Sequence, residues 1–209
     1  PGNLQRINGM PRFVHMVQLW FAALHGRDLV ELPNLVGHVL GALSVYGVAR
    51  HLKVQKSTAL GWAFVWCLTP GLLRLTPGIM VDPLSASLVA AATYLVLVPR
   101  WSVLSTVTAA LACSLTIGTK FHVVVVSFVL SVALLVRLLH VRTSWTPRRW
   151  WPTTSLSAFI IVMGLVAVFG RNVHHFENPI WPAGVKIPGT SIKLKSAHDM
   201  KDAWTSGKG

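Results

Sequence analysis

The fold of this chain is decided by residues 82–136, which read DPLSASLVAAATYLVLVPRWSVLSTVTAALACSLTIGTKFHVVVVSFVLSVALLV. Three apolar runs follow one another here, at about residues 84–98, 101–117 and 121–136, with only short turns between them. Each run is slightly shorter than the roughly 20 residues of a typical transmembrane helix, so flanking Trp, Ser and Thr side chains must reach into the interface. The stretch therefore predicts consecutive membrane-spanning helices.

Similar apolar runs lie on both sides of this stretch, at about residues 35–49, 58–73 and 156–170. The composition agrees with this pattern, because 53% of the residues are hydrophobic, the mean hydropathy is +0.57 and only 6 residues are acidic. A soluble globular protein with so little charge would precipitate. We therefore expect an all-α fold, a polytopic transmembrane helical bundle of about six spans.

Ahead of these runs, residues 11–24 carry apolar side chains at helical spacing. Pro11 suits the start of a helix and Gly26 its end, and the pattern predicts an amphipathic helix at the membrane interface, although the periodicity alone fits a short transmembrane helix equally well. We expect an extracytoplasmic segment with this interfacial helix over residues 1–33 and the helical bundle over residues 34–170. Residues 171–209 then form an extracytoplasmic loop or the start of a truncated soluble domain.

The basic residues are distributed unevenly between the predicted connections. If the connections alternate between two sides, one side holds most of the positive charge: Arg50, Lys53, Lys56, Arg100, Arg137, Arg142, Arg148 and Arg149. By the positive-inside rule this side faces the cytoplasm, which puts Asp82, Lys120 and residues 172–182 together on the outer face. The net charge of +13 could also indicate nucleic-acid binding, but the basic residues lie between apolar runs and not along one face. Nucleic acid is therefore not an expected partner.

Asp82 is the only carboxylate between Asn34 and Phe176. An acid at the mouth of a membrane span is usually kept there for chemistry or ion contact. Two interpretations stay open. Asp82, followed by Pro83, could cap the start of a helix through backbone N–H groups. Alternatively it could contact a divalent metal ion or an acceptor, while Arg74 nearby holds an anionic group.

Further candidate residues lie in two other predicted outer connections. Lys120 lies in the turn between two apolar runs, where its ammonium could extend to the interface or pair with the phosphate of a lipid-linked substrate. His174, His175 and Glu177 follow the last run and are outer-loop candidates. They form a weak zinc pattern, because adjacent histidines in an extended chain point to opposite faces.

The two cysteines, Cys67 and Cys113, both fall within apolar runs. We expect them to be packing residues and not to form a disulfide.

The order of these features is similar to that of a known family across most of residues 11–182. The matching stretches are residues 11–26; Leu32, Pro33 and Asn34 opening a span that ends in Tyr46, Ala49 and Arg50; residues 70–83 with Asp82; residues 117–121; and residues 177–182. In this order and spacing the chain resembles the membrane-embedded glycosyltransferases of the GT-C superfamily, especially the protein mannosyltransferase group.

The resemblance implies an enzyme that transfers a hexose or pentose from a polyprenyl-phosphate donor to a glycan, lipid or protein acceptor. It places this inverting displacement at the outer face of the bacterial cytoplasmic membrane. In such families an outer loop ahead of the interfacial helix carries the catalytic carboxylate. We therefore expect the main catalytic carboxylate upstream of Pro1 and the chain to be a fragment. For Asp82 the resemblance implies a supporting or metal-contacting role, and for Lys120 it leaves the role open.

Two other classes of function stay open. A transporter subunit would carry ionisable residues near the middle of its spans, where this sequence has little beyond His38, and would be built from two related halves, of which no repeat is evident. A noncatalytic membrane scaffold, or a truncated inactive product, is also compatible with a chain that lacks the preceding outer loop. Upstream sequence would separate these alternatives from the transferase.

Overall fold

We describe the structure from a computed structural model of the chain. It describes residues 13–25, 29–77, 82–98, 101–120, 123–179, 185–186 and 193–194. The predicted helix-flanking residues Pro11 and Gly26 lie outside the described residues, as does most of the segment 180–209.

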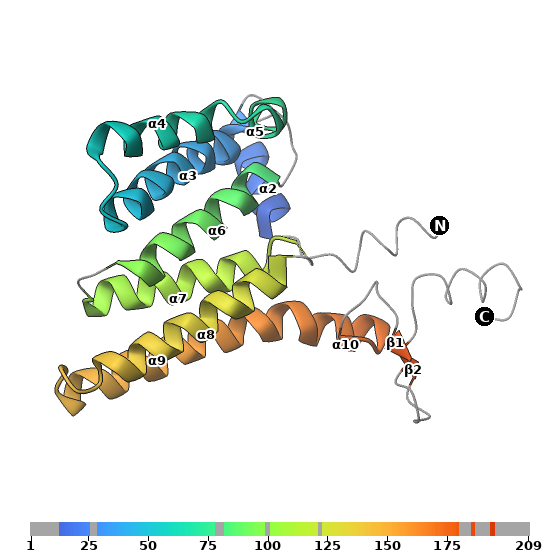
Figure 1. Ribbon diagram of the computed structural model, residues 1–209. Helices are drawn as coiled ribbons and strands as arrows, with labels where there is room; N and C mark the ends of the chain where they lie inside the picture. Colours follow the sequence, from blue (N-terminus) through green and yellow to red (C-terminus); the bar gives the residue numbers. More distant parts are fainter. Residues whose placement is uncertain are drawn as a thin grey trace, which may run out of the picture.

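The described part of the chain is built almost entirely of helices, as the sequence predicts (Figure 1). In chain order they are α2 (Phe13–His25), α3 (Leu32–His51), α4 (Lys56–Cys67), α5 (Pro70–Leu75), α6 (Asp82–Leu97), α7 (Val103–Ile117), α8 (Val123–Val141), α9 (Pro147–Leu165), the π-helical turn η2 (Val166–Gly170) and α10 (Arg171–Phe176). Two short antiparallel strands follow, β1 (Val185–Lys186) and β2 (Lys193–Leu194), with Val185 opposite Leu194. The all-α prediction is confirmed.

Three of the described helical segments are long and apolar enough to cross a membrane: Leu32–His51, Val123–Val141 and Pro147–His175. Helices α6 and α7 are apolar but shorter, with 16 and 15 residues. The chain therefore has the helices of a membrane protein, while the number of about six spans stays a prediction.

The predicted span at residues 58–73 is wrong as a single helix. Helix α4 ends at Cys67, and α5 begins at Pro70 after a break at Leu68 and Thr69. Proline has no N–H to continue the hydrogen-bond ladder, so it starts a new helix here. The 12 residues of α4 rise about 18 Å, which is less than the roughly 30 Å hydrocarbon core of a bilayer.

The last predicted span and the loop after it also differ from the structure. Helix α9 begins at Pro147, well before residue 156, and continues through η2 into α10 as one helical segment up to His175. The predicted boundary at residue 171 therefore falls inside this helical segment. The polar residues from Arg171 onward continue the helix directly after the apolar residues, with no turn between them. A prediction based on composition places a loop where polarity rises, and it therefore ended the span too early.

Close helix contacts hold the bundle together. Helices α3 and α6 form the most extensive contact, and a Cβ atom added at Gly37 would lie 2.7 Å from Leu84 Cδ1 and 3.2 Å from Leu84 Cα. Helix α7 packs against α6, α8 and α9, and its small residues form much of the core with Ala92, Leu130, Leu134 and Leu138. Cys113 lies in this core, which confirms its predicted packing role, whereas Cys67 is only partly buried; both cysteines are free.

The helices run back and forth between two ends of the bundle (Figure 1). One end, which we call the Asp82 end, contains α2, α5, the beginnings of α6 and α8, the end of α7 and α10. The opposite end, which we call the arginine end, contains the α3–α4 and α8–α9 connections. Asp82 and Lys120 therefore lie at the end away from Arg142, Arg148 and Arg149.

Candidate functional site

The candidate site is an ion pair at the Asp82 end. Lys120 Nζ donates a hydrogen bond to Asp82 Oδ1, although the two residues are 38 positions apart in the chain. The side chain of Asp82 is 41% exposed and that of Lys120 is 27% exposed. Because both side chains are partly exposed, a ligand can contact the pair from outside the bundle without a change in the fold.

Asp82 is the first residue of α6, which confirms that it lies at a helix start. Pro83 follows in the first turn and is buried, and the Ser87 hydroxyl donates to the Pro83 carbonyl at 2.7 Å. The observed partner of the Asp82 carboxylate is the Lys120 ammonium. Neither interpretation from the sequence included this partner.

Buried hydroxyl groups fix the turn that presents Lys120. Thr119 is 1% exposed, and its hydroxyl donates to the Thr116 carbonyl at 2.7 Å. The hydroxyl groups of Ser127 on α8 and Thr116 on α7 lie 2.6 Å apart, which joins the two helices just behind the turn. Because buried polar groups that are paired resist rearrangement, Lys120 is presented from a rigid base.

Helix α2 is fastened to the same turn. The Phe13 amide donates to the Gly118 carbonyl at 3.0 Å, and a Cβ atom at Gly118 would lie 3.1 Å from Phe13 Cβ. Val14 and Gln18 face the bundle and are 0% and 4% exposed, whereas Trp20 and Leu24 are exposed. The apolar outer face fits a helix lying in the membrane interface.

Gln18 is a polar residue on the side of α2 that faces the bundle. It is buried, and its Nε2 has no hydrogen-bond partner among the described residues.

Among the residues that the structure describes, Asp82 is the only hydrogen-bond partner of the Lys120 ammonium. An ammonium group has three N–H donors, and the contact with Asp82 uses one of them. The remaining donors can bind an anionic group without breaking the pair, while the carboxylate holds the ammonium in position. Chemically, the pair can therefore serve as an oriented cation for a phosphate at the bundle surface.

Arg74 is not brought into contact with this pair. It lies in the last turn of α5, is exposed, and its side chain makes no hydrogen bond or ion pair with any described residue. Helix α5 packs against α6, so Arg74 shares the Asp82 end. Its predicted role in holding an anionic group stays a prediction.

The histidine group lies on α10, also at the Asp82 end. His174 and His175 are exposed on a helix, with ring centroids 4.9 Å apart, so the extended chain assumed from the sequence is wrong. Glu177 follows with a left-handed φ of 53° and ends the helix. In the part of the chain that the structure describes, no three His, Cys, Asp or Glu residues lie close enough together to hold a metal ion. Metal contact by Asp82 therefore stays a prediction.

A polar cluster inside the bundle was missed by the sequence argument. His38 is 7% exposed, its Nε2 lies 3.1 Å from the Cys67 carbonyl and its Nδ1 lies 3.1 Å from the Thr76 hydroxyl. The Trp66 indole donates to the His38 carbonyl at 3.2 Å. The signal in the sequence was a lone histidine in an apolar run. Because both ring nitrogens are engaged, this histidine joins α3 to the end of α4 and to the end of α5.

Comparisons with protein families, with curated proteins and with solved structures found no match to this chain.

Proposed function

We propose that this chain is part of an integral membrane glycosyltransferase that moves a sugar from a polyprenyl-phosphate donor to an acceptor at the extracytoplasmic face. The observation that carries the proposal is the Lys120–Asp82 pair, a partly exposed cation held by a carboxylate at the end of the bundle away from the arginines. The resemblance described for residues 11–182 supports the reaction class.

The pair suits the donor phosphate. A polyprenyl-phosphate sugar places its phosphate at the membrane surface and its chain among apolar helices. Lys120 lies two residues after Gly118, whose carbonyl accepts from the amide of Phe13 at the start of α2, and α2 carries exposed apolar residues. The turn can therefore hold the phosphate while α2 offers an apolar surface to the chain. A lysine binds phosphate as a point charge and tolerates several orientations of the donor.

The reaction that follows is a displacement at the anomeric carbon. The acceptor hydroxyl oxygen forms the new bond to that carbon, the bond from the carbon to the phosphate oxygen breaks, and polyprenyl phosphate leaves with the electron pair. A carboxylate takes the proton of the acceptor. By the resemblance this carboxylate belongs to an outer loop ahead of α2, and we assign Asp82 the supporting role of positioning Lys120.

Binding of the leaving group tests this assignment without requiring turnover. The protein is reconstituted in phosphatidylcholine vesicles, and its affinity for a polyprenyl phosphate is compared with that for the corresponding uncharged polyprenol. We expect the phosphate to bind more tightly, and Lys120→Gln to weaken it roughly 10- to 100-fold, as for the loss of a charged hydrogen bond.

Lys56→Gln is the matched control, because it removes the same charge from an exposed lysine at the arginine end. Its affinity should equal that of the unmodified protein. Equal weakening by both variants would mean that only the overall charge matters, and it would overturn the assignment of Lys120.

A further inference from the structure

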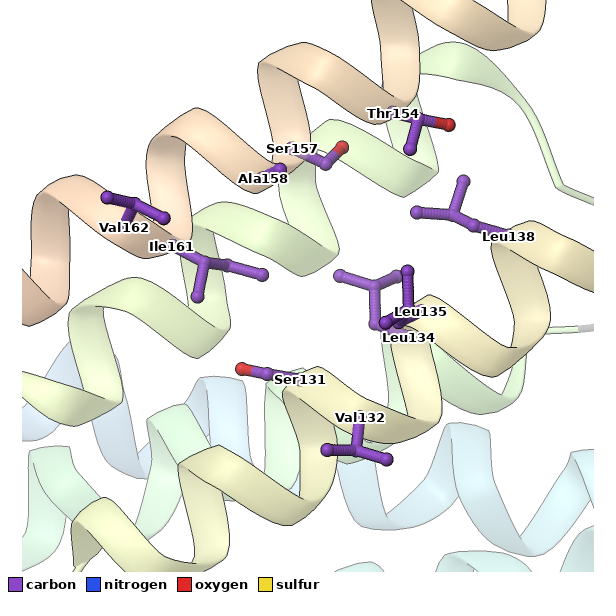
Figure 2. Close-up of a pocket in the computed structure, with 10 residues that line it drawn as sticks. All are labelled: Ser131, Val132, Leu134, Leu135, Leu138, Thr154, Ser157, Ala158, Ile161 and Val162. Atoms are coloured by element: carbon purple, nitrogen blue, oxygen red, sulfur yellow. The ribbon is translucent and has the colours of Figure 1, made fainter.

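A cavity lies between α8 and α9, towards the arginine end (Figure 2). Its volume is about 230 Å³. Figure 2 shows Leu134 and Leu138 of α8 across from Ser157 and Ile161 of α9. The cavity exists because both helices pack against α7 and make little contact with each other.

The cavity opens on the outside of the bundle. Val132 and Val162 line it and are 43% and 51% exposed. In a membrane this surface faces hydrocarbon. The volume is below the roughly 300 Å³ of the smallest pockets that enclose a drug-sized ligand, so it suits a segment of a flexible chain.

Two buried hydroxyl groups lie in the mostly apolar wall of the cavity. Ser157 is 1% exposed, and its Oγ has no hydrogen-bond partner among the residues the structure describes. Thr154 lies one turn nearer the arginine end, and its buried Oγ1 also has no hydrogen-bond partner among the described residues. Both line the cavity, as Figure 2 shows. Buried hydroxyls of this kind call for an acceptor, such as the carbonyl oxygen of an ester.

Positively charged side chains lie in and next to the α8–α9 connection, at the same end of the bundle as the cavity. Arg142, Arg148 and Arg149 are exposed and make no ion pair with any described residue. The Arg142 guanidinium lies 5.3 Å from the centroid of the Trp150 ring, and the Trp150 indole donates to the carbonyl of Leu138 at 2.8 Å. Leu138 lines the cavity, so these contacts connect the arginine to the cavity edge.

We propose that this cavity is a binding site for an anionic glycerophospholipid, with one acyl chain between α8 and α9 and the phosphate at Arg142 and Arg149. Along α9, Thr154 lies about 7.5 Å and Ser157 about 12 Å beyond Arg149, at the 1.5 Å rise per residue of a helix. The hydroxyls therefore lie just below the phosphate, where the ester carbonyls of such a lipid lie. Basic pockets between membrane helices recognise anionic headgroups in this way. The site goes beyond the proposed function and lies at the opposite end from Lys120.

Lipid retention tests the proposal. The full chain is reconstituted in vesicles of phosphatidylglycerol and phosphatidylcholine in equal amounts, extracted in mild detergent and analysed by native mass spectrometry. We expect phosphatidylglycerol to be retained in preference to phosphatidylcholine. The double variant Arg142→Gln/Arg149→Gln should weaken retention roughly 30-fold, as for two surface cations.

The matched control is Lys53→Gln/Lys56→Gln, which removes the same charge from the α3–α4 connection at the same end. It should retain the lipid like the unmodified protein. Equal loss in the two double variants, no lipid retained by the unmodified protein, or equal retention of both lipids would each overturn the proposal.

The cavity itself is tested by Ala158→Phe, which places a ring in the space that the chain would occupy. We expect it to abolish retention while the thermal unfolding transition stays cooperative. Ser157→Ala is a milder second variant that removes one hydroxyl without adding volume, and it should speed lipid release several-fold. Unchanged retention in a folded Ala158→Phe protein would contradict the proposed place of the chain.

Discussion

At the Asp82 end of the bundle a lysine lies against a carboxylate, whereas at the arginine end exposed arginines lie against tryptophan rings. The first arrangement fixes one cation in one position and leaves part of its hydrogen-bonding capacity for a ligand. The second leaves several cations without an anionic partner among the described residues. The comparison teaches that the two ends of one helical bundle present positive charge in different ways, and we propose a different ligand for each: a substrate phosphate at the Asp82 end and a membrane lipid at the arginine end.

On the proposed glycosyltransferase function, the largest effect is expected on sugar transfer. Asp82→Asn should lower transfer from a radiolabelled lipid-linked sugar about 100-fold, because the ammonium loses the carboxylate that orients it towards the developing charge. Membrane insertion should be unchanged, which fractionation can verify. Arg148→Gln, at the arginine end, should transfer sugar at the normal rate. Normal turnover by Asp82→Asn would remove Asp82 from the active site.

An intermediate effect is expected at the arginine end, on stability and not on transfer. Trp150→Phe removes the indole donor from the Leu138 carbonyl, one of the last four carbonyls of α8, which a helix leaves without an internal partner. The variant should lose about 1–3 kcal/mol of unfolding free energy, measured by denaturation in mild detergent. A loss no larger than that of the exposed control Trp151→Phe would show that the bond contributes nothing.

The smallest effect is expected on the stability contributed by the ion pair. Because both side chains are partly exposed, a double-mutant cycle of Asp82→Asn and Lys120→Gln should give a coupling of only about 0.2–1 kcal/mol. A small coupling beside a large loss of transfer would sharpen the contrast between the two ends. A coupling of several kcal/mol would instead make the pair a structural element.

The sequence predicts the helices best where apolar runs are bounded by strong signals. Helices α6 and α7 begin and end close to the predicted bounds, because Pro83 and Gly118 mark the ends of their runs. The run at residues 58–73 fails, since its apolar composition continues across Pro70 while the backbone ladder cannot. An apolar composition indicates that a stretch is buried or in contact with lipid. It does not indicate whether the stretch forms one helix or two.

The candidate site was predictable only in part. Successive helices run in opposite directions, and two of them, α6 and α7, separate Asp82 from Lys120. Counting the predicted spans therefore places both residues at one end. Their direct contact depends on which helices are lateral neighbours, and the packing of α6 against α7 and α8 decides that. No local pattern in the sequence encodes this arrangement. The helical geometry of His174 and His175 was missed for the opposite reason, because their polarity hid the continuation of α9.

The central claim is that the two ends of the bundle lie on opposite sides of the membrane, and cysteine labelling tests it most directly. After Cys67 and Cys113 are replaced, single cysteines are introduced at the exposed residues Arg74, at the Asp82 end, and Ser144, at the arginine end. With a membrane-impermeant maleimide applied to intact cells, Arg74→Cys should react at once and Ser144→Cys only after the membrane is permeabilised. Labelling of both positions from the same side would contradict the account.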